Sequence, residues 1–188
     1  INQKFPKFEE ISINKIIDYN EIQNLLKKDE AILYFLSDNS ATASFLISNN
    51  GIKISRTVLT VEEIEKYSNQ LRESLDLNNV NSYKDIKSFP IQISQKLYKE
   101  LISEFEDDLD EIKHLFIVPT YKMHSIPFST LVDNSYKFNK TSYKSTPWLI
   151  NKHSISILPS INSLKIFRTL KNDEYFNNSL NTFVGIGN

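Results

Sequence analysis

An apolar run at residues 115–118, followed by a turn that contains proline, constrains the fold more than any other segment. Every side chain in this run is apolar, which is typical of a strand that is covered on both faces. Pro119 follows the run, and Pro127 lies near the start of residues 126–132, where we predict a short helix. A buried strand, a rigid turn and a short helix together favour an α/β fold.

Three further strands are predicted upstream, at residues 31–36, 42–48 and 52–58. The first is apolar throughout, and the third alternates between apolar and polar residues, as a half-buried strand does. The sequence Asn-Asn-Gly at 49–51 separates the second strand from the third, and these residue types tolerate the positive φ of a tight turn. The three segments therefore predict an antiparallel β-meander.

Two helices are predicted after the meander. Thr60 and Glu63 have the spacing of a capping box, in which a hydroxyl and a carboxylate satisfy the first free N–H groups of a helix. The second helix opens near Pro90, because proline is well placed in a first turn. The residues expected on the two buried faces are Val61, Ile64, Tyr67, Leu71 and Leu75, and then Ile93, Leu97, Leu101 and Phe105.

The C-terminal part carries two more predicted strands, at residues 154–158 and 182–187. Trp148 is expected to anchor residues 148–150 in the core. Since a buried strand needs neighbours on both sides, and the chain ends just after the last one, we expect a truncated domain. Between the strands, Ser160 is predicted to cap a helix whose buried residues are Ile161, Leu164, Phe167 and Leu170.

The composition is that of a folded domain with no strong charge field. The chain has 188 residues, 22 basic against 23 acidic, and a net charge of −1, so we expect neither nucleic acid nor a membrane surface as a partner. The acidic stretch at 104–111 is interpreted as a solvated helix end. No cysteine occurs, which excludes disulfides, thiolate chemistry and cysteine-based zinc sites, and fits a cytoplasmic location. We expect no cofactor.

The histidines give no catalytic or metal-binding pattern. His114, His124 and His153 lack the short spacing of a zinc motif, and the serines near His124 are not in a nucleophile elbow. We therefore interpret all three as structural and assign no catalytic, cofactor-binding or metal-binding residue. The two glycines at 185 and 187 lack the other parts of a dinucleotide fingerprint. The loop at 136–143 is either a contact surface for a partner or substrate, or merely mobile.

Several loose motifs, in order along residues 20–188, resemble the CHAT domain family of caspase- and separase-related cysteine peptidases. No single motif is strict, and the resemblance is carried by their order. The motifs are Asp29-Glu30-Ala-Ile-Leu-Tyr-Phe35, Leu97-Tyr98-Lys-Glu-Leu101, Ile117-Val-Pro119 with Ile126-Pro-Phe-Ser-Thr-Leu131, Trp148-Leu-Ile150 with Ile155-Ser-Ile-Leu-Pro-Ser160, and Phe183-Val-Gly-Ile-Gly-Asn188.

The resemblance implies a fold in which the meander and its helices lead into a mixed, caspase-like sheet. It implies that residues 1–29 are a linker from an upstream TPR region, and that residues 30–188 are the N-terminal part of a CHAT-like domain. In that family the catalytic His and Cys lie on later strands, which here would follow Asn188. The chain would then brace a peptidase sheet, with the C-terminal part of the same protease, the TPR repeats and a peptide substrate as partners. The alternative is a non-catalytic binding or scaffold module, which the missing cysteine also fits.

Overall fold

The computed structural model describes residues 18–78, 80–136 and 143–171, which fall in two compact units. One unit is Leu26–Leu158. The other comprises Ile1–Leu25 and Pro159–Asn188, and is described at helices α2 (Tyr19–Leu25) and α7 (Ile161–Lys171). These two helices contact each other, and Glu21 of α2 forms an ion pair of 2.5 Å with Lys165 of α7.

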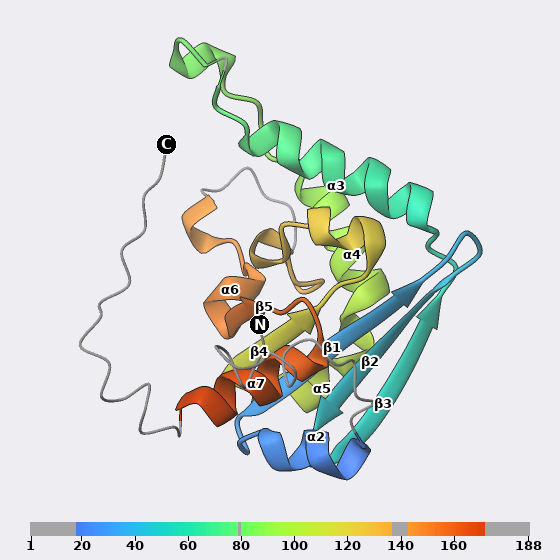
Figure 1. The fold of residues 1–188 in the computed structure, drawn as a ribbon. Coiled ribbons are helices and arrows are strands. Elements are labelled where there is room, and N and C mark those ends of the chain that lie inside the picture. The colour runs from blue at the N-terminus through green and yellow to red at the C-terminus, as the bar shows by residue number, and fades with distance from the viewer. Residues whose placement is uncertain (1–17, 79, 137–142, 172–188) are drawn as a thin grey trace, which may run out of the picture. The chain divides into compact units, whose positions relative to one another are not determined.

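The larger unit is built on a mixed sheet of five strands in the order β3-β2-β1-β4-β5 (Figure 1). β2 pairs antiparallel with both β1 and β3, which confirms the predicted meander, while β4 pairs in parallel with β1, and β5 with β4. The predicted α/β class and mixed sheet are thus confirmed. The strands are β1 (Glu30–Ser37), β2 (Thr42–Ser48), β3 (Gly51–Thr57), β4 (His114–Val118) and β5 (Ser154–Ile157).

Local polar contacts fix the turns of the meander. Asp38 closes the first turn, since its Oδ1 accepts hydrogen bonds from the backbone N–H groups of Ser40 (2.7 Å) and Ala41 (2.9 Å) and from the Ser40 hydroxyl. These hydrogen bonds hold the pKa of Asp38 below its ordinary value. The second turn ends at Gly51, whose φ of 138° is open to glycine and costly for other residues.

Helices cover one face of this sheet and complete its core. The capping box of α3 is present, with Glu63 N–H donating to Thr60 Oγ1 (3.3 Å) and Thr60 N–H to Glu63 Oε2 (3.1 Å). Leu33, Leu46 and Ile117 of the sheet belong to the same buried cluster as residues from these helices. The helices are α3 (Val61–Leu75), α4 (Ile91–Leu101), α5 (Glu106–Leu109) and α6 (Leu149–Lys152), with single 3-10 turns at Tyr83–Asp85, Ser103–Phe105, Tyr121–Ser125, Phe128–Thr130 and Tyr143–Ser145.

Some predicted buried positions are wrong. Leu75 is 46% exposed, because the residues that follow α3 are themselves exposed and place nothing against its last turn. Ser68 is buried in its place on the inner face of the helix, where its hydroxyl donates to the Ile64 carbonyl (2.6 Å). Phe167 of α7 is 60% exposed, and Trp148 is half-buried.

The helix predicted at 126–132 is a single 3-10 turn, Phe128–Thr130. The chain leaves the turn at Leu131, whose carbonyl accepts a hydrogen bond from Leu149 N–H (2.8 Å). Val132 then forms an isolated antiparallel bridge with Trp148, and this extended pairing is incompatible with a longer helix. The strand predicted at 182–187 lies outside the described residues.

The difference in exposure between Leu71 and Leu75 of α3 can be tested with a matched pair of variants. We expect Leu71→Ala to lower the free energy of unfolding by about 3 kcal/mol, because Leu71 is fully buried and its loss leaves a cavity. Leu75→Ala, one turn later in the same helix, should cost less than about 1 kcal/mol. Urea unfolding followed by circular dichroism measures both, and equal losses would contradict the described packing of α3.

Candidate functional site

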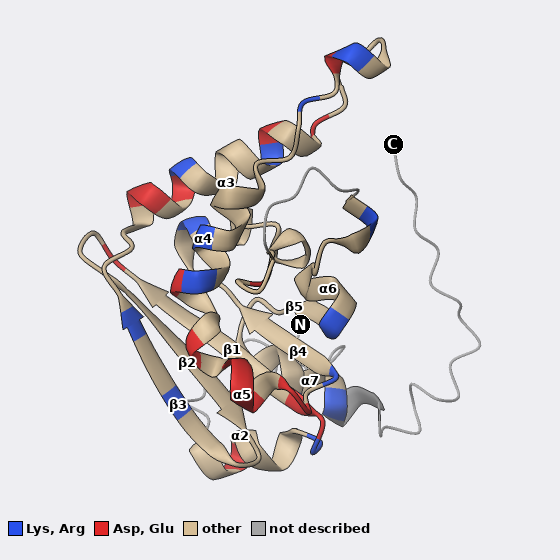
Figure 2. Cartoon of the chain, turned by 180° about the vertical axis from the view of Figure 1, so that it is seen from behind, with Lys and Arg blue, Asp and Glu red and all other residues tan. Residues whose placement is uncertain are grey.

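A hollow of about 430 Å³ is the part of the larger unit where polar side chains converge. Its lining comes from α4, α5 and α6, and its charged groups lie on or next to the short helices α5 and α6, which precede the parallel strands β4 and β5. Figure 2 shows the acidic residues of α5 as red ribbon. The lining residues are Tyr98, Glu106, Asp107, Leu109, Asp110, Lys152 and His153.

His153 is held as a neutral imidazole in the wall of this hollow. It follows the last residue of α6, is 6% exposed, and its Nδ1 lies 2.6 Å from the Ile112 carbonyl oxygen. A carbonyl only accepts, so Nδ1 carries the proton and Nε2 is left as an acceptor. Burial lowers the pKa of His153, and the neighbouring Lys152 adds to this effect, while the bond to Ile112 opposes it.

Tyr98 and Glu106 form a second buried pair. Tyr98 is 2% exposed, and the Glu106 carboxylate lies close enough to affect its hydroxyl. Burial, with the negative charge of nearby carboxylates, raises the pKa of Tyr98, so the phenol stays protonated. One carboxylate oxygen of Glu106, Oε1, is buried without a hydrogen-bond partner.

The charge of Lys152 is already balanced by Asp133. The Lys152 ammonium donates to Asp133 Oδ2, and Ser135 N–H donates to Oδ1 (2.6 Å). Burial alone would raise the pKa of Asp133, but these hydrogen bonds outweigh it and hold the pKa below its ordinary value. Because Lys152 is paired in this way, the carboxylates of α5 leave the hollow with an excess of negative charge.

The hollow can bind through charge and hydrogen bonds, but it offers neither the hydroxyl of a serine or threonine nor a thiol as a nucleophile. None of its lining residues is a serine, threonine or cysteine, and the phenol of Tyr98 stays protonated. Within residues 18–78, 80–136 and 143–171, no group of three or more His, Asp or Glu side chains is placed to hold a metal ion. No helix of that part of the chain is long and apolar enough to cross a membrane.

The three histidines considered from the sequence lie in three different places. His124 is exposed in the 3-10 turn Tyr121–Ser125, and its carbonyl accepts from Arg72 Nη2 (3.4 Å). His114 begins β4, stacks on Phe116 at 4.3 Å between ring centroids, and is far in sequence from His153. The structure therefore brings only His153 to the hollow.

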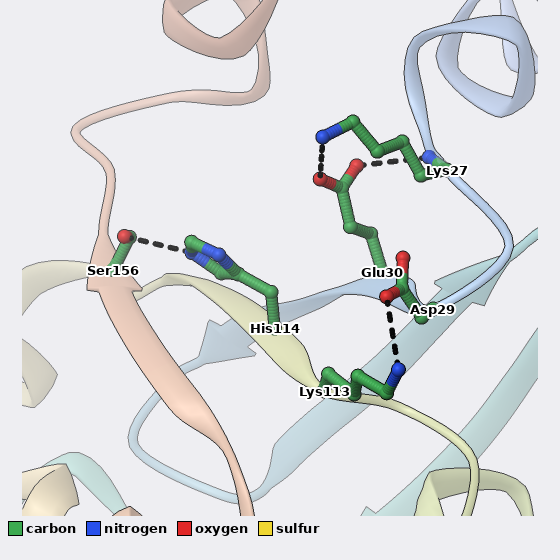
Figure 3. A network of polar contacts seen from close by, with 6 residues as sticks. All are labelled: Lys27, Asp29, Glu30, Lys113, His114 and Ser156. Carbon is green, nitrogen blue, oxygen red and sulfur yellow. Dashed lines mark hydrogen bonds and ion pairs between the residues drawn. The ribbon is translucent and has the colours of Figure 1, made fainter.

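His114 makes a contact that was not predicted from the sequence. Its Nε2 lies 2.9 Å from Ser156 Oγ on the neighbouring parallel strand, a distance suited to a base and a nucleophile (Figure 3). Figure 3 shows the Glu30 carboxylate directed to Lys27, with Oε2 2.8 Å from the Lys27 backbone nitrogen and Oε1 3.7 Å from its ammonium. Neither His114 nor Ser156 lines the hollow. We therefore assign no catalytic role to the His114–Ser156 pair.

The buried state of His153 predicts a pH dependence of stability. Since burial lowers the pKa of the folded state, the unfolded chain binds the proton more readily. The free energy of unfolding should therefore fall as the pH drops below the ordinary value of 6.5, until the folded pKa is reached. Urea titrations between about pH 5 and about pH 8 should show a weaker decline for His153→Gln. Parallel declines for the two proteins would contradict the assignment.

The comparisons with known proteins bear on the same region of the chain. The family model of the CHAT domain matches residues 92–185, half of the sequence, from the first turn of α4 through the hollow, β4 and β5. A search of the curated proteins finds no match. The matched segment contains three of the motif groups that carry the resemblance in full, and it confirms that resemblance. The chain belongs to the CHAT domain family of caspase-like, peptidase-related modules.

Proposed function

We propose that this chain is the non-catalytic N-terminal portion of a CHAT-type cysteine endopeptidase. In this proposal it braces a catalytic sheet whose His and Cys are supplied from beyond Asn188. The family match supports a peptidase-related module, and the sequence contains no cysteine to act as its nucleophile. The chemistry of such an enzyme must therefore come from another part of the protein.

The free edge of β5 is the observation that carries the proposal. The N–H groups of Ser154 and Leu158 donate to carbonyls of the β4 segment, at 2.8 Å each. Because backbone groups alternate along a strand, Ile155 and Ile157 direct their N–H and C=O groups away from β4. Among the described residues, no strand pairs with that side of β5. Parallel strands are normally covered on both sides, so this edge suits further parallel strands.

The strands next to this edge are rigid enough to position such an addition. The four residues after His114 in β4 are at most 7% exposed, and β4 pairs in parallel with both β1 and β5. Ile155 packs against the main buried cluster. A strand added to β5 would thus be aligned by β5, which itself pairs with the buried strand β4.

A chain that braces a catalytic sheet would have specific partners. We propose that they are the C-terminal part of the same protease, TPR repeats upstream of the chain and a peptide substrate, in a cytoplasmic protein. The proposal assigns no role to a cofactor, nucleic acid or membrane. The boundary at residues 29 and 30 between linker and CHAT-like domain is part of the same proposal.

A second candidate is a binding or scaffold module that is never part of an active peptidase. The acidic hollow favours it, since Glu106, Asp107 and Asp110 line a space that has no serine, threonine or cysteine in its wall. In that case the complete protein would have no cysteine and no histidine on strands after Asn188.

The proposal is tested with the protein expressed from its complete gene. Ile157→Pro removes an N–H that points away from β4, and therefore blocks the free edge without removing a β4–β5 hydrogen bond. We expect cleavage of a peptide library by this variant to fall about 100-fold, because displaced catalytic groups lose their alignment. Ile157→Val, which keeps the N–H, should retain activity, and replacing the downstream cysteine with alanine should abolish it.

Two outcomes contradict the proposal. Full activity of the Ile157→Pro protein would mean that the catalytic strands do not depend on this edge. A complete protein that folds but cleaves nothing, with or without a downstream cysteine, would support the scaffold candidate instead.

A further inference from the structure

The carboxylates in the wall of the hollow have no cation of this chain beside them. Glu106, Asp107 and Asp110 line the hollow, and within the residues that the structure describes none of the three forms an ion pair. Asp108 lies on the same short helix but does not line the hollow, and it is paired with Lys53 at 2.7 Å. The acids that face the hollow are therefore the uncompensated ones.

A buried histidine adds an acceptor that does not belong to the acidic stretch. His153 is 6% exposed and lines the hollow, and its Nδ1 proton is directed to the Ile112 carbonyl. In the described part of the chain no group donates to its Nε2. Buried acceptors are normally paired, so an unused acceptor in the wall of a cavity points to a ligand that carries a donor.

The acceptors from the two sides of the hollow converge. The Asp110 carboxylate lies close enough to act on the pKa of both His153 and Tyr98, which come from different helical segments. Glu106 Oε1 is buried without a hydrogen-bond partner, so its charge is only partly solvated. A ligand that suits this wall has a positive charge and several N–H donors that point in different directions.

The size and lining of the hollow favour an organic cation. Within residues 18–78, 80–136 and 143–171, no group of three or more His, Asp or Glu side chains is placed to hold a metal ion. A volume of about 430 Å³ has room for a larger group, and Leu109 and the ring of Tyr98 offer apolar surface to an alkyl stem. A guanidinium has five N–H donors in one plane and is more weakly hydrated than an ammonium, so it loses less on entering a partly buried site.

We propose that the hollow binds a guanidinium group, which donates to the carboxylates of Glu106 and Asp110 and to Nε2 of His153. The His153 ring is already fixed by Ile112, so little ordering opposes binding. Lys152 keeps its own partner, Asp133, and does not compete for these carboxylates. The guanidinium is either the side chain of an arginine in a protein segment or part of a small free compound. The inference does not rest on the proposed function, because it concerns binding and needs no peptidase activity.

The first test is a calorimetric titration of the 188-residue chain with agmatine, a four-carbon amine that ends in a guanidinium. We expect a dissociation constant between about 0.1 mM and about 1 mM, since a few charge-assisted hydrogen bonds form in a site that is open to water. Putrescine has the same four-carbon stem with an ammonium in place of the guanidinium, and should bind at least about fivefold more weakly. Equal affinities would overturn the assignment to guanidinium, and no binding of agmatine at about 10 mM would overturn the proposal.

A matched pair of variants locates the site. Asp110→Asn should weaken agmatine binding about tenfold, and because Asp110 is exposed the variant should keep the circular dichroism spectrum of the wild type. Glu111→Gln is the control: it removes the same charge from the next residue, which is exposed and does not line the hollow, and should bind like the wild type. Equal losses in the two variants would mean a diffuse attraction to the acidic stretch and would overturn the proposed site.

A blocked Gly-Arg-Gly peptide distinguishes the two sources of the guanidinium. Binding as tight as that of agmatine, and equally sensitive to Asp110→Asn, would assign the hollow to an arginine of a protein segment. Binding of agmatine without binding of the peptide would assign it to a small free compound. These titrations are independent of the cleavage assay with Ile157→Pro, so failure of this proposal and failure of the proposed function give separate results.

Discussion

The structure depends on β1, because both backbone edges of this strand are occupied. Its residues pair antiparallel with β2 over six positions on one side, and parallel with β4 over five positions on the other. Ala31, Ile32 and Leu33 are fully buried, and Leu33 lies between Leu46 of β2 and Ile117 of β4. A strand of this kind joins two different ladders into one sheet. The edges of that sheet, β3 and β5, are therefore unlike each other: one ends an antiparallel meander and the other ends a parallel series.

Local chemistry explains why the meander could be predicted and the parallel part could not. The turn residues at Asn49, Asn50 and Gly51 and the capping pair Thr60 and Glu63 act within a few positions, and the predicted bounds of β2 are those observed. By contrast, the parallel pairing of Glu30 with His114 joins residues far apart in the chain. Nothing in either segment specifies its neighbour, so strand order had to come from the structure.

Periodicity predicted which helix residues are buried only where the chain before and after the helix also packs against the core. Periodicity places Leu71 and Leu75 on one stripe of α3, yet only Leu71 meets the core, because the chain after α3 stays in solvent.

The residues around the hollow show the same limit of sequence-based prediction. Tyr98, Asp133 and His153 acquire shifted pKa values from residues that approach in the fold, and the sequence alone offered only the acidic stretch at 104–111, which we interpreted as a solvated helix end. Glu106 in that stretch instead lines the hollow, with its carboxylate Oε1 buried.

The described unit is suited to holding neighbouring strands in place. Several of its polar groups are committed to one another: Lys152 to Asp133 and His153 to Ile112. Such pairs stiffen the ends of β4 and β5, since breaking any of them leaves a buried polar group without a partner. Among the described residues, no strand pairs with the outer sides of β3 and β5. The buried strand β1, which pairs with both β2 and β4, holds these two edges in one sheet.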